Sequence, residues 1–425
     1  MSPSRVLLRA LRHRNYRIFM GGQAISLIGT WMQTVGESWL VYRLTGSALL
    51  LGVAQFANRI PIFLLAPIGG AVADRYDRHR IVIATQVASM CLAGTLAALT
   101  LTHHVRIWHL MTIAALLGVV NAFDIPGRQS FVVELVARDD LQNAIALNSS
   151  MFNGARIVGP AIAGVVVAAV GEGWCFFANA VSYIAVITGL LIMRVPVRPT
   201  ARPQSMLAHV LEGFRFVSQT RPIRILLLLL GLVSLMGTPY SVLMPIIADQ
   251  TFRAGPRGLG ILMGAAGVGA LIGALSLASR VGLRGYGRSI GLAAIGFGLS
   301  LVAFSFTRSL WLGVALLLPV GFSMMTQMAA SNTLIQSMIP NTLRGRVMAV
   351  YSMMFMGMAP IGALLAGILA GWIGATTTIA AGGAACLAGG LLFLHYLPRF
   401  RGEARQLIRA QQPGELNTSL SATTS

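Results

Sequence analysis

The chain has 425 residues, of which 56% are hydrophobic and only 10% carry a formal charge. Soluble domains are about a quarter charged, so this composition excludes an ordinary soluble enzyme. The net charge is +20, and all lysine-plus-arginine positions are arginine. These arginines cluster between apolar segments, which is the pattern of a membrane topology signal rather than of nucleic-acid binding.

Twelve apolar segments follow one another along the chain, each with room for the roughly 20 residues that cross a bilayer as a helix. The first follows the basic stretch Arg5 to Arg17 and is too long for the core of a signal peptide, so we expect an uncleaved first helix. The sequence predicts an all-α polytopic membrane protein. The predicted spans are 18–41, 49–72, 81–101, 107–126, 144–170, 174–193, 223–247, 259–279, 289–306, 310–330, 347–370 and 375–397.

The arginines also predict an orientation. With Met1 in the cytoplasm, 25 arginines fall on the cytoplasmic side and 5 on the opposite side. Because positively charged loops are retained in the cytoplasm, both termini are expected there. The absence of lysine beside abundant alanine, glycine and arginine indicates a bacterial gene, which predicts the inner (cytoplasmic) membrane as the location.

An internal repeat divides the chain. A shift of 203 positions superposes Gly118 on Gly321, Met151-Phe152 on Met354-Phe355 and Gly159 on Gly362. Two parallel, pseudo-symmetric six-helix bundles follow from it. We expect an N-terminal half at 1–193, a cytoplasmic loop at 194–222, a C-terminal half at 223–397 and a partly disordered cytoplasmic tail at 398–425. Apolar residues from Leu207 to Val217 recur at helical spacing, which predicts an amphipathic helix on the membrane surface.

A short basic turn, Gly69 to Arg80, joins the second and third spans. Its spacing Gly70-x-x-x-Asp74-Arg75-x-x-Arg78-x-Arg80 resembles the signature of the major facilitator superfamily, although Asp77 stands where that family usually has glycine. An ion pair of Asp74 with Arg128, which ends the fourth span on the same side, is geometrically reasonable. The resemblance implies a cytoplasmic gate, and the alternative is that these arginines only set topology. The gate candidates are Gly70, Asp74, Arg75, Arg78 and Arg128.

Ionisable groups inside predicted spans mark candidate sites, because charge in hydrocarbon is costly. Glu37, near the outer end of the first span, is the first candidate for a proton carrier, and Asp124 is the second. The alternatives for Glu37 are a solvated helix end or a static partner of Arg59 or Arg43. Arg59 and Arg156 would attract an anionic cargo, or would lock helices together. The predicted cavity residues are Gln33, Asn58, Arg59, Asn153, Arg156, Gln327 and Tyr351.

The fifth span contains Gly-Ala-Arg-Ile-Val-Gly-Pro-Ala-Ile-Ala-Gly from Gly154 to Gly164. Its proline bends the helix and its small residues permit close packing. Gly159, Pro160 and Gly164 resemble the antiporter motif of facilitator exporters, which favours export; a kinked packing helix is the alternative. Gly29 to Gln33, Trp39 to Ser47 and Phe123 to Gln129 are similar to the efflux subgroup that contains the enterobactin exporter.

The expected function is therefore proton-coupled secondary export of small amphipathic or anionic compounds, such as drugs or siderophores, through a monomer in the lipid bilayer. Protons and a small molecule are the expected partners, and nucleic acid is not. No enzymatic activity, cofactor or metal is expected, since the cysteines lack metal spacing and no phosphate-binding loop is present. An uptake symporter or a lipid transporter is the alternative, and a membrane-embedded enzyme is a weaker one.

Overall fold

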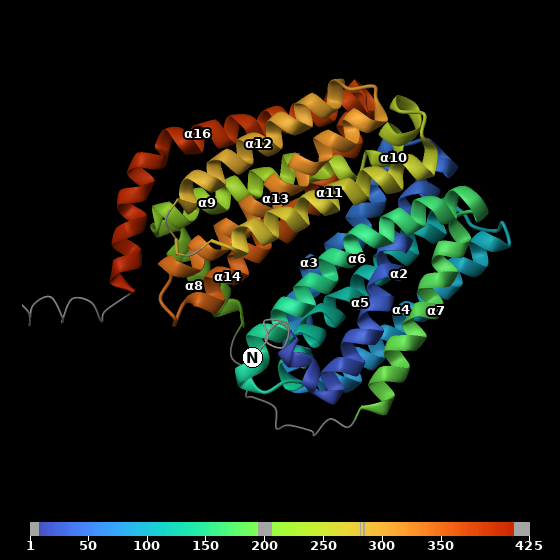
Figure 1. Ribbon diagram of the computed structural model, residues 1–425, viewed down its shortest axis with the longest axis horizontal. Helices are drawn as coiled ribbons and strands as arrows, with labels where there is room; N and C mark the ends of the chain where they lie inside the picture. Colours follow the sequence, from blue (N-terminus) through green and yellow to red (C-terminus); the bar gives the residue numbers. More distant parts are fainter. Residues whose placement is uncertain (1–7, 194–205, 281, 284, 412–425) are drawn as a thin grey trace, which may run out of the picture.

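The computed structural model describes residues 8–193, 206–280, 282–283 and 285–411, and the regular structure of these ranges is helical throughout. Figure 1 shows two helix bundles inclined to one another, with the first half in blue to green and the second in yellow to red. The first bundle contains α2 (Arg14–Thr45), α3 (Ala48–Arg75), α4 (Arg78–Leu101), α5 (Ile107–Glu134), α6 (Leu141–Val170) and α7 (Glu172–Ile192).

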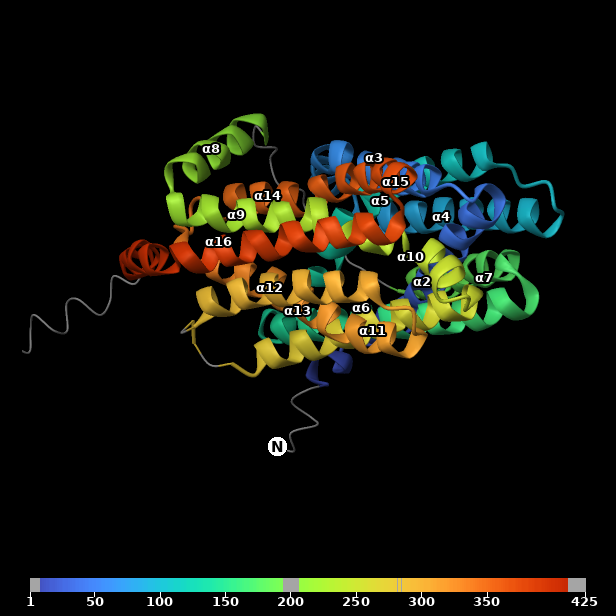
Figure 2. The same cartoon turned by 90° about the horizontal axis from the view of Figure 1, so that it is seen from above.

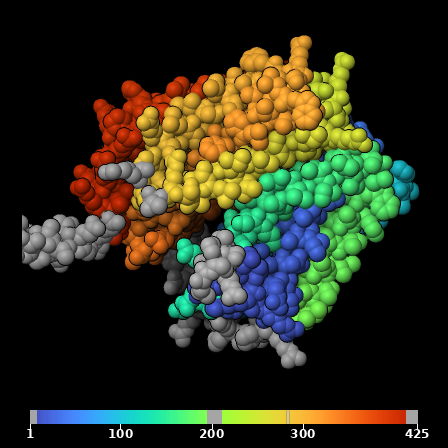
Figure 3. Space-filling model, in the orientation of Figure 1, coloured from blue at the N-terminus to red at the C-terminus, as the bar shows by residue number. Residues whose placement is uncertain are grey.

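The second bundle has more interruptions. Its helices are α9 (Arg221–Leu232), α10 (Met244–Ile246), α11 (Gly255–Ala278), α12 (Tyr286–Phe306), α13 (Leu310–Met338), α14 (Arg344–Ser352), α15 (Met358–Ile373) and α16 (Ala375–Ala410). In the space-filling view of Figure 3 the halves meet along a continuous seam, where yellow α11 lies against green α6.

Eleven helical segments among the described residues are long and apolar enough to cross a membrane. Eleven of the twelve predicted spans correspond to them. The first predicted span falls on α2, which has 32 residues and packs between α6 and α7 but is not among the eleven. Gln23, Gln33 and Glu37 lower its mean hydropathy. The bundle around α2 is nevertheless built of spanning helices.

The seventh and eleventh predicted spans are broken helices. The seventh passes through a π-helical turn, Val233–Gly237, and a 3-10 turn, Thr238–Ser241, before α10. Pro239 lacks a backbone N–H and so cannot continue an α-helical ladder. The eleventh contains a π-helical turn, Met353–Gly357, between α14 and α15. Single π-turns inside helices are frequent at functional sites.

The predicted amphipathic helix of the central loop is present as α8 (Met206–Gln219). It lies outside both bundles in Figure 2 and packs against α14. Glu212 forms an ion pair with Arg346, and a Cβ at Gly213 would lie 2.6 Å from the Arg346 carbonyl oxygen. The predicted boundary at 397 is not a helix end, since α16 continues to Ala410. The disorder expected near the C-terminus falls outside the described residues.

Candidate functional site

A cavity of about 350 Å³ lies between the two halves. The first half contributes residues of α2, α3 and α6. The second half contributes the broken turns after α9 together with α11, α13 and α15. Its lining is mostly apolar, with hydroxyl and methionine side chains on the second half. The residues that line it are Trp31, Thr34, Ser38, Gln55, Arg59, Ile62, Phe63, Phe152, Arg156, Pro160, Ser234, Thr238, Pro239, Tyr240, Ser241, Val242, Met244, Leu262, Met263, Ala266, Met324, Met328, Phe355, Met356, Ala359 and Ala363.

The repeat of 203 positions relates the two walls of this cavity. Seven lining residues of the first half fall on seven lining residues of the second half at that offset. The cavity therefore lies on the pseudo-symmetry axis of the molecule, between equivalent helices. The pairs are Trp31 and Ser234, Ser38 and Ser241, Arg59 and Leu262, Phe63 and Ala266, Phe152 and Phe355, Arg156 and Ala359, and Pro160 and Ala363.

Charge distinguishes the two walls. Arg59 and Arg156 lie on the first half, and their repeat equivalents are Leu262 and Ala359. Arg59 is exposed to the cavity, and its electrostatic neighbour is Arg156 rather than a carboxylate. The Arg156 guanidinium carbon stands 5.9 Å from the centre of the Trp31 ring, which is cation–π range. Both walls carry aromatic and hydroxyl side chains, but the two charged lining residues belong to the first half.

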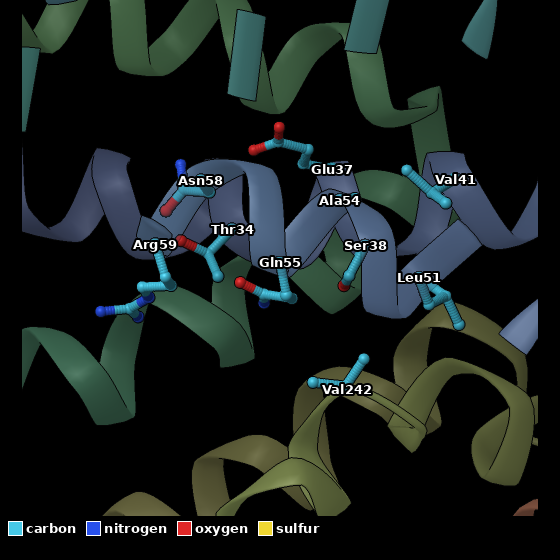
Figure 4. Close-up of a pocket in the computed structure, with 10 residues that line it drawn as sticks. All are labelled: Thr34, Glu37, Ser38, Val41, Leu51, Ala54, Gln55, Asn58, Arg59 and Val242. Carbon is cyan, nitrogen blue, oxygen red and sulfur yellow. The ribbon is translucent and has the colours of Figure 1, made fainter. Parts of the chain in front are cut away.

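Glu37 belongs to a smaller side pocket of the same region. It shares that pocket with Thr34, Gln55, Asn58 and Arg59. In Figure 4 the Glu37 side chain points away from Val242, which comes from the second half, whereas Gln55 lies on the side nearer to Val242. No ion pair or hydrogen bond holds the Glu37 carboxylate among the residues that the structure describes.

The static partners considered for Glu37 are engaged elsewhere or directed elsewhere. Arg43 binds Glu172 at the start of α7, with Nε 2.7 Å from Oε1 and one terminal nitrogen 3.3 Å from Oε2. Arg59 lies on the other side of the side pocket in Figure 4. Pairing of Glu37 with Arg43, one of the sequence alternatives, is therefore wrong.

The other predicted cavity residues lie at different depths. Asn58 lines the side pocket and donates to the Ala114 carbonyl over 3.3 Å. Gln33, Asn153, Gln327 and Tyr351 line neither pocket and are buried inside the bundles. Their partners, where the structure gives them, are Asn179 for Gln33, the Ser149 carbonyl for Asn153 and the Met328 carbonyl for Tyr351. These four residues therefore do not line either of the two pockets described here. For Gln33, the polar stripe of α2 predicts a helix face but not what that face meets.

Asp124 is a buried carboxylate within the first bundle. It accepts hydrogen bonds from Thr85 Oγ1 at 2.9 Å and Gln86 Nε2 at 2.8 Å, both on α4. Arg128, one turn further along α5, lies 3.2 Å from its other oxygen. This predicted proton site is therefore an ion pair in the bundle interior, away from the cavity.

The gate candidates lie together at the end of the molecule that carries the termini. They do not form the ion pair that the sequence predicts. Asp74 lies 3.7 Å from Arg78 of its own turn, and Arg128 is held by Asp124. The predicted ion pair of Asp74 with Arg128 is absent from the described residues. Arg78 is anchored instead by Glu134, at 2.7 Å. Arg75 is exposed, and Gly70 lies on the last turns of α3.

The four residues of the antiporter-like motif lie in four different environments. A Cβ at Gly159 would collide with Trp31 on α2. Gly164 faces the other half, where a Cβ would lie 2.9 Å from the Pro256 carbonyl oxygen and 3.1 Å from the Gly260 Cα. Gly154 faces open space. Pro160 lines the cavity.

The end opposite the termini is closed by contacts between the halves. Gly52 on α3 packs on Gly367 on α15, where a Cβ added to either glycine would lie 3.1–3.2 Å from the other Cα. The α6–α11 crossing at Gly164 and Gly260 is its counterpart. Tyr42 also donates a 2.8 Å hydrogen bond to Asp249 across the seam. We refer to these three contacts as the far-end closure.

Sequence reasoning missed several of these ionic residues. Glu134, Glu172 and Asp249 all lie near helix ends, where the search for intramembrane charge did not look. Asp140 was missed for the same reason, although it is fully buried and accepts Arg9, Arg12 and His13 of the N-terminal segment. An unpaired acid at a helix end of a strongly basic chain is the signal that could have found them.

The sequence is similar to those of several characterised transport proteins. The Multidrug efflux pump Tap of Mycolicibacterium fortuitum is 29% identical over 386 residues, which cover 88% of this chain and 93% of that protein. The Staphyloferrin A transporter of Staphylococcus aureus is 28% identical over 253 residues, or 58% of this chain and 62% of that protein. The chain thus spans less than two thirds of the latter relative.

Solved structures show the same fold. A bacterial homologue of the iron transporter ferroportin in its inward-facing state superposes with a TM-score of 0.67 at 19% identity, covering 90% of this chain and 98% of that chain. Its outward-facing state gives a TM-score of 0.59, with coverage of 91% and 100%. The family described as transmembrane secretion effector matches residues 7–422. Because that match covers nearly the whole sequence, the chain is a multi-pass membrane protein that belongs to this major facilitator family.

Proposed function

We propose that the chain is a secondary exporter that works by alternating access in the cytoplasmic membrane of a bacterium. Its α2 would complete twelve spans, with both termini in the cytoplasm. The observation that carries the proposal is a cavity lined by repeat-equivalent residues of both halves and closed at the far end. Rocking of two such halves exposes a central site to each side in turn. The better superposition on an inward-facing neighbour than on its outward-facing state supports an inward-open conformation here.

The cargo is a small amphipathic compound that carries negative charge. Arg59 and Arg156 supply two cations that form no ion pair with a carboxylate among the described residues, and guanidinium groups bind carboxylates in a bidentate way. The facing wall, with Leu262, Met263 and Met324, suits an apolar body, and methionine adapts to varied shapes. The names of the relatives, a staphyloferrin transporter and a multidrug efflux pump, support export of such compounds.

Proton exchange at Glu37 would couple export to the proton gradient. Its carboxylate is half-buried, lines a pocket beside Arg59 and has no fixed partner in the described structure. Asp124, by contrast, is held by three donors. The family assignment favours transport over the membrane-enzyme alternative. Two alternatives compete with this proposal: transport in the direction of uptake, and a lipid as the cargo. The following measurement distinguishes them.

The test is transport in inverted membrane vesicles. A panel of anionic, neutral and cationic amphipaths is offered with and without an imposed proton gradient. Wild type is compared with Glu37→Gln and with Glu403→Gln, a control that removes an acid whose partner in the described structure is Arg221 at the surface. We expect gradient-driven accumulation of anions, lost in Glu37→Gln and kept in Glu403→Gln. Equal accumulation in both variants would show that Glu37 does not couple transport. Accumulation only in right-side-out vesicles would identify an uptake system.

A further inference from the structure

An aromatic and cationic cluster lies in the wall that the first half contributes to the cavity. Trp31 comes from α2, while Phe152 and Arg156 come from α6, one helical turn apart, and all three side chains line the cavity. The Arg156 guanidinium carbon stands 5.9 Å from the centre of the Trp31 ring. The Trp31 and Phe152 rings meet edge to face, with their centroids 5.8 Å apart. The indole thus contacts both a second ring and a cation of the same neighbouring helix.

Close packing of the two helices fixes the base of the Trp31 side chain. A Cβ at Gly159 would lie 2.4 Å from Trp31 Cβ and 2.9 Å from the Ile28 carbonyl oxygen. Neither atom belongs to the flexible end of a side chain, so any residue larger than glycine at this position would push α2 away from α6. The close crossing at Gly159 therefore brings the indole within reach of Arg156, which lies one turn earlier on α6.

Arg156 has no ion pair or hydrogen bond with any residue in the ranges that the structure describes. Its charge acts on Arg59, on the same wall, and on the Tyr240 hydroxyl of the second half. Like charges in a cavity of low dielectric repel one another, and an arginine side chain is long enough to move in response. Attraction to the face of the indole counters this repulsion. Trp31 is thus the described contact that holds the Arg156 guanidinium in the cavity.

The second half shows that helix packing alone does not require an indole here. At the repeat offset of 203, Trp31 corresponds to Ser234 and Phe152 corresponds to Phe355. These two residues also meet, because Ser234 Oγ donates to the Phe355 carbonyl oxygen at 2.6 Å. The equivalent of Arg156 is an alanine. The same crossing of helices is therefore built with a small hydroxyl side chain where no cation has to be held.

We propose that Trp31 sets the preference of the cavity for anionic cargo, because it positions the Arg156 guanidinium for the acidic group. The inference rests on the anionic cargo proposed above. An arginine that is already ordered keeps its planar set of N–H donors available for a carboxylate, and it loses less conformational entropy when cargo binds. The carboxylate would accept from Arg156 beside the indole, while the apolar body would lie toward the methionines of the second half. Trp31 is therefore a positioning residue that acts through Arg156.

The test compares an acid with the amide of the same molecule. Full-length protein in lipid nanodiscs is titrated with dansyl-undecanoic acid and with its primary amide, two probes of similar size that differ in negative charge. We expect wild type to bind the acid more tightly. Trp31→Leu should lower the ratio of the two affinities by about 5- to 30-fold, as expected for loss of a desolvated cation–π contact. Trp31→Phe keeps an aromatic face and should lower the ratio less.

Two controls separate positioning from packing. Trp174→Leu makes the same change at a tryptophan of α7, whose ring meets Phe177 edge to face at 5.7 Å but lines neither pocket. This variant should keep the wild-type ratio. In an Arg156→Gln background, Trp31→Leu should lower the ratio no further, because the cation through which Trp31 acts is absent.

The possible results bear on different steps. A wild type that binds the acid no better than the amide would refute the anionic cargo, and the role of Trp31 with it. An acid preference that stays at the wild-type ratio in Trp31→Leu would refute only the role of Trp31, even if both probes bind more weakly. A further loss in the Arg156→Gln background would show that Trp31 does not act through Arg156. Should Trp31→Leu fail to fold, Trp31→Phe decides, because a phenyl ring fills the position but attracts a cation less strongly than an indole does.

Discussion

The far-end closure can be opened by adding one methyl group. In Gly260→Ala the new Cβ would lie 2.5 Å from the Pro160 carbonyl oxygen, 2.9 Å from Gly164 Cα and 3.1 Å from Gly164 N. All three atoms are backbone, so no side-chain rotation relieves the contact, and α6 and α11 must separate. Overpacking of this kind costs about 1–3 kcal/mol. Because the cost falls on the state in which the halves touch, the equilibrium should shift toward the state open at this end by roughly 5- to 150-fold.

The assay is a distance measurement between spin labels placed on Thr45 and Gly371, on either side of the closed end, in a variant whose exposed cysteine Cys91 is replaced by serine. Gly260→Ala should increase the population of long distances. Gly154→Ala is the matched control, because that glycine belongs to the same motif but has open space at its Cβ position. The control also corrects for the gain in helix propensity, about 1 kcal/mol, that accompanies any such change. An unchanged distance distribution in Gly260→Ala would show that this crossing does not hold the closed state.

Three further changes probe contacts of the same structure. Arg43→Gln should destabilise the protein by about 1–3 kcal/mol, because Glu172 is left buried and unpaired. A melting curve in detergent measures this loss, and the double variant with Glu172→Gln should recover part of it. Tyr42→Phe removes the hydrogen bond to Asp249 and should raise accessibility of the far end to a thiol reagent at a nearby engineered cysteine, by the equivalent of about 0.5–1.5 kcal/mol. Gly213→Val should detach α8 from α14, seen as faster proteolysis at α8 with unchanged melting of the bundles. Unchanged melting of Arg43→Gln, unchanged accessibility in Tyr42→Phe or unchanged cleavage of Gly213→Val would each contradict the corresponding expectation.

The sequence was sufficient for the elements of the fold. Apolar length predicts the spans, and the 203-residue offset predicts two equivalent halves. The same offset pairs cavity residues such as Arg156 and Ala359. The repeat therefore identifies more of the cavity-lining positions than a search for charged residues does. Helix breaks were harder to predict: Gly237 and Pro239 mark one, but nothing local in the sequence distinguishes a π-turn from a regular helix at Met353.

Hydrogen-bond and ion-pair partners that are far apart in the chain could not be predicted from the sequence in the same way. Tyr42 and Asp249 are 207 positions apart, and Arg43 reaches Glu172 across 129. Such pairs depend on which helix ends meet, which is a property of the packed bundles. Gln33 shows the limit most clearly. Its spacing from Glu37 predicts that the two share one face of α2, yet Gln33 meets Asn179 of α7 whereas Glu37 lines the side pocket beside Asn58 of α3.

That orientation has a consequence for coupling. If Glu37 opened into the cavity, an anionic cargo and the proton could interact directly at one place, and an empty cavity would leave Arg59 free to pair with Glu37. In the structure Glu37 lines the side pocket, whereas Arg59, on the neighbouring helix α3, lines both the side pocket and the cavity. In the proposed mechanism, cargo acts on Arg59 of α3 and the proton on Glu37 of α2, two helices that share a side pocket. Cargo would neutralise the charge on Arg59 and the proton would neutralise the charge on Glu37, so each ligand would change the electrostatic cost of burying the other group. Coupling through the α2–α3 pair requires only that both helices move together when the halves rock.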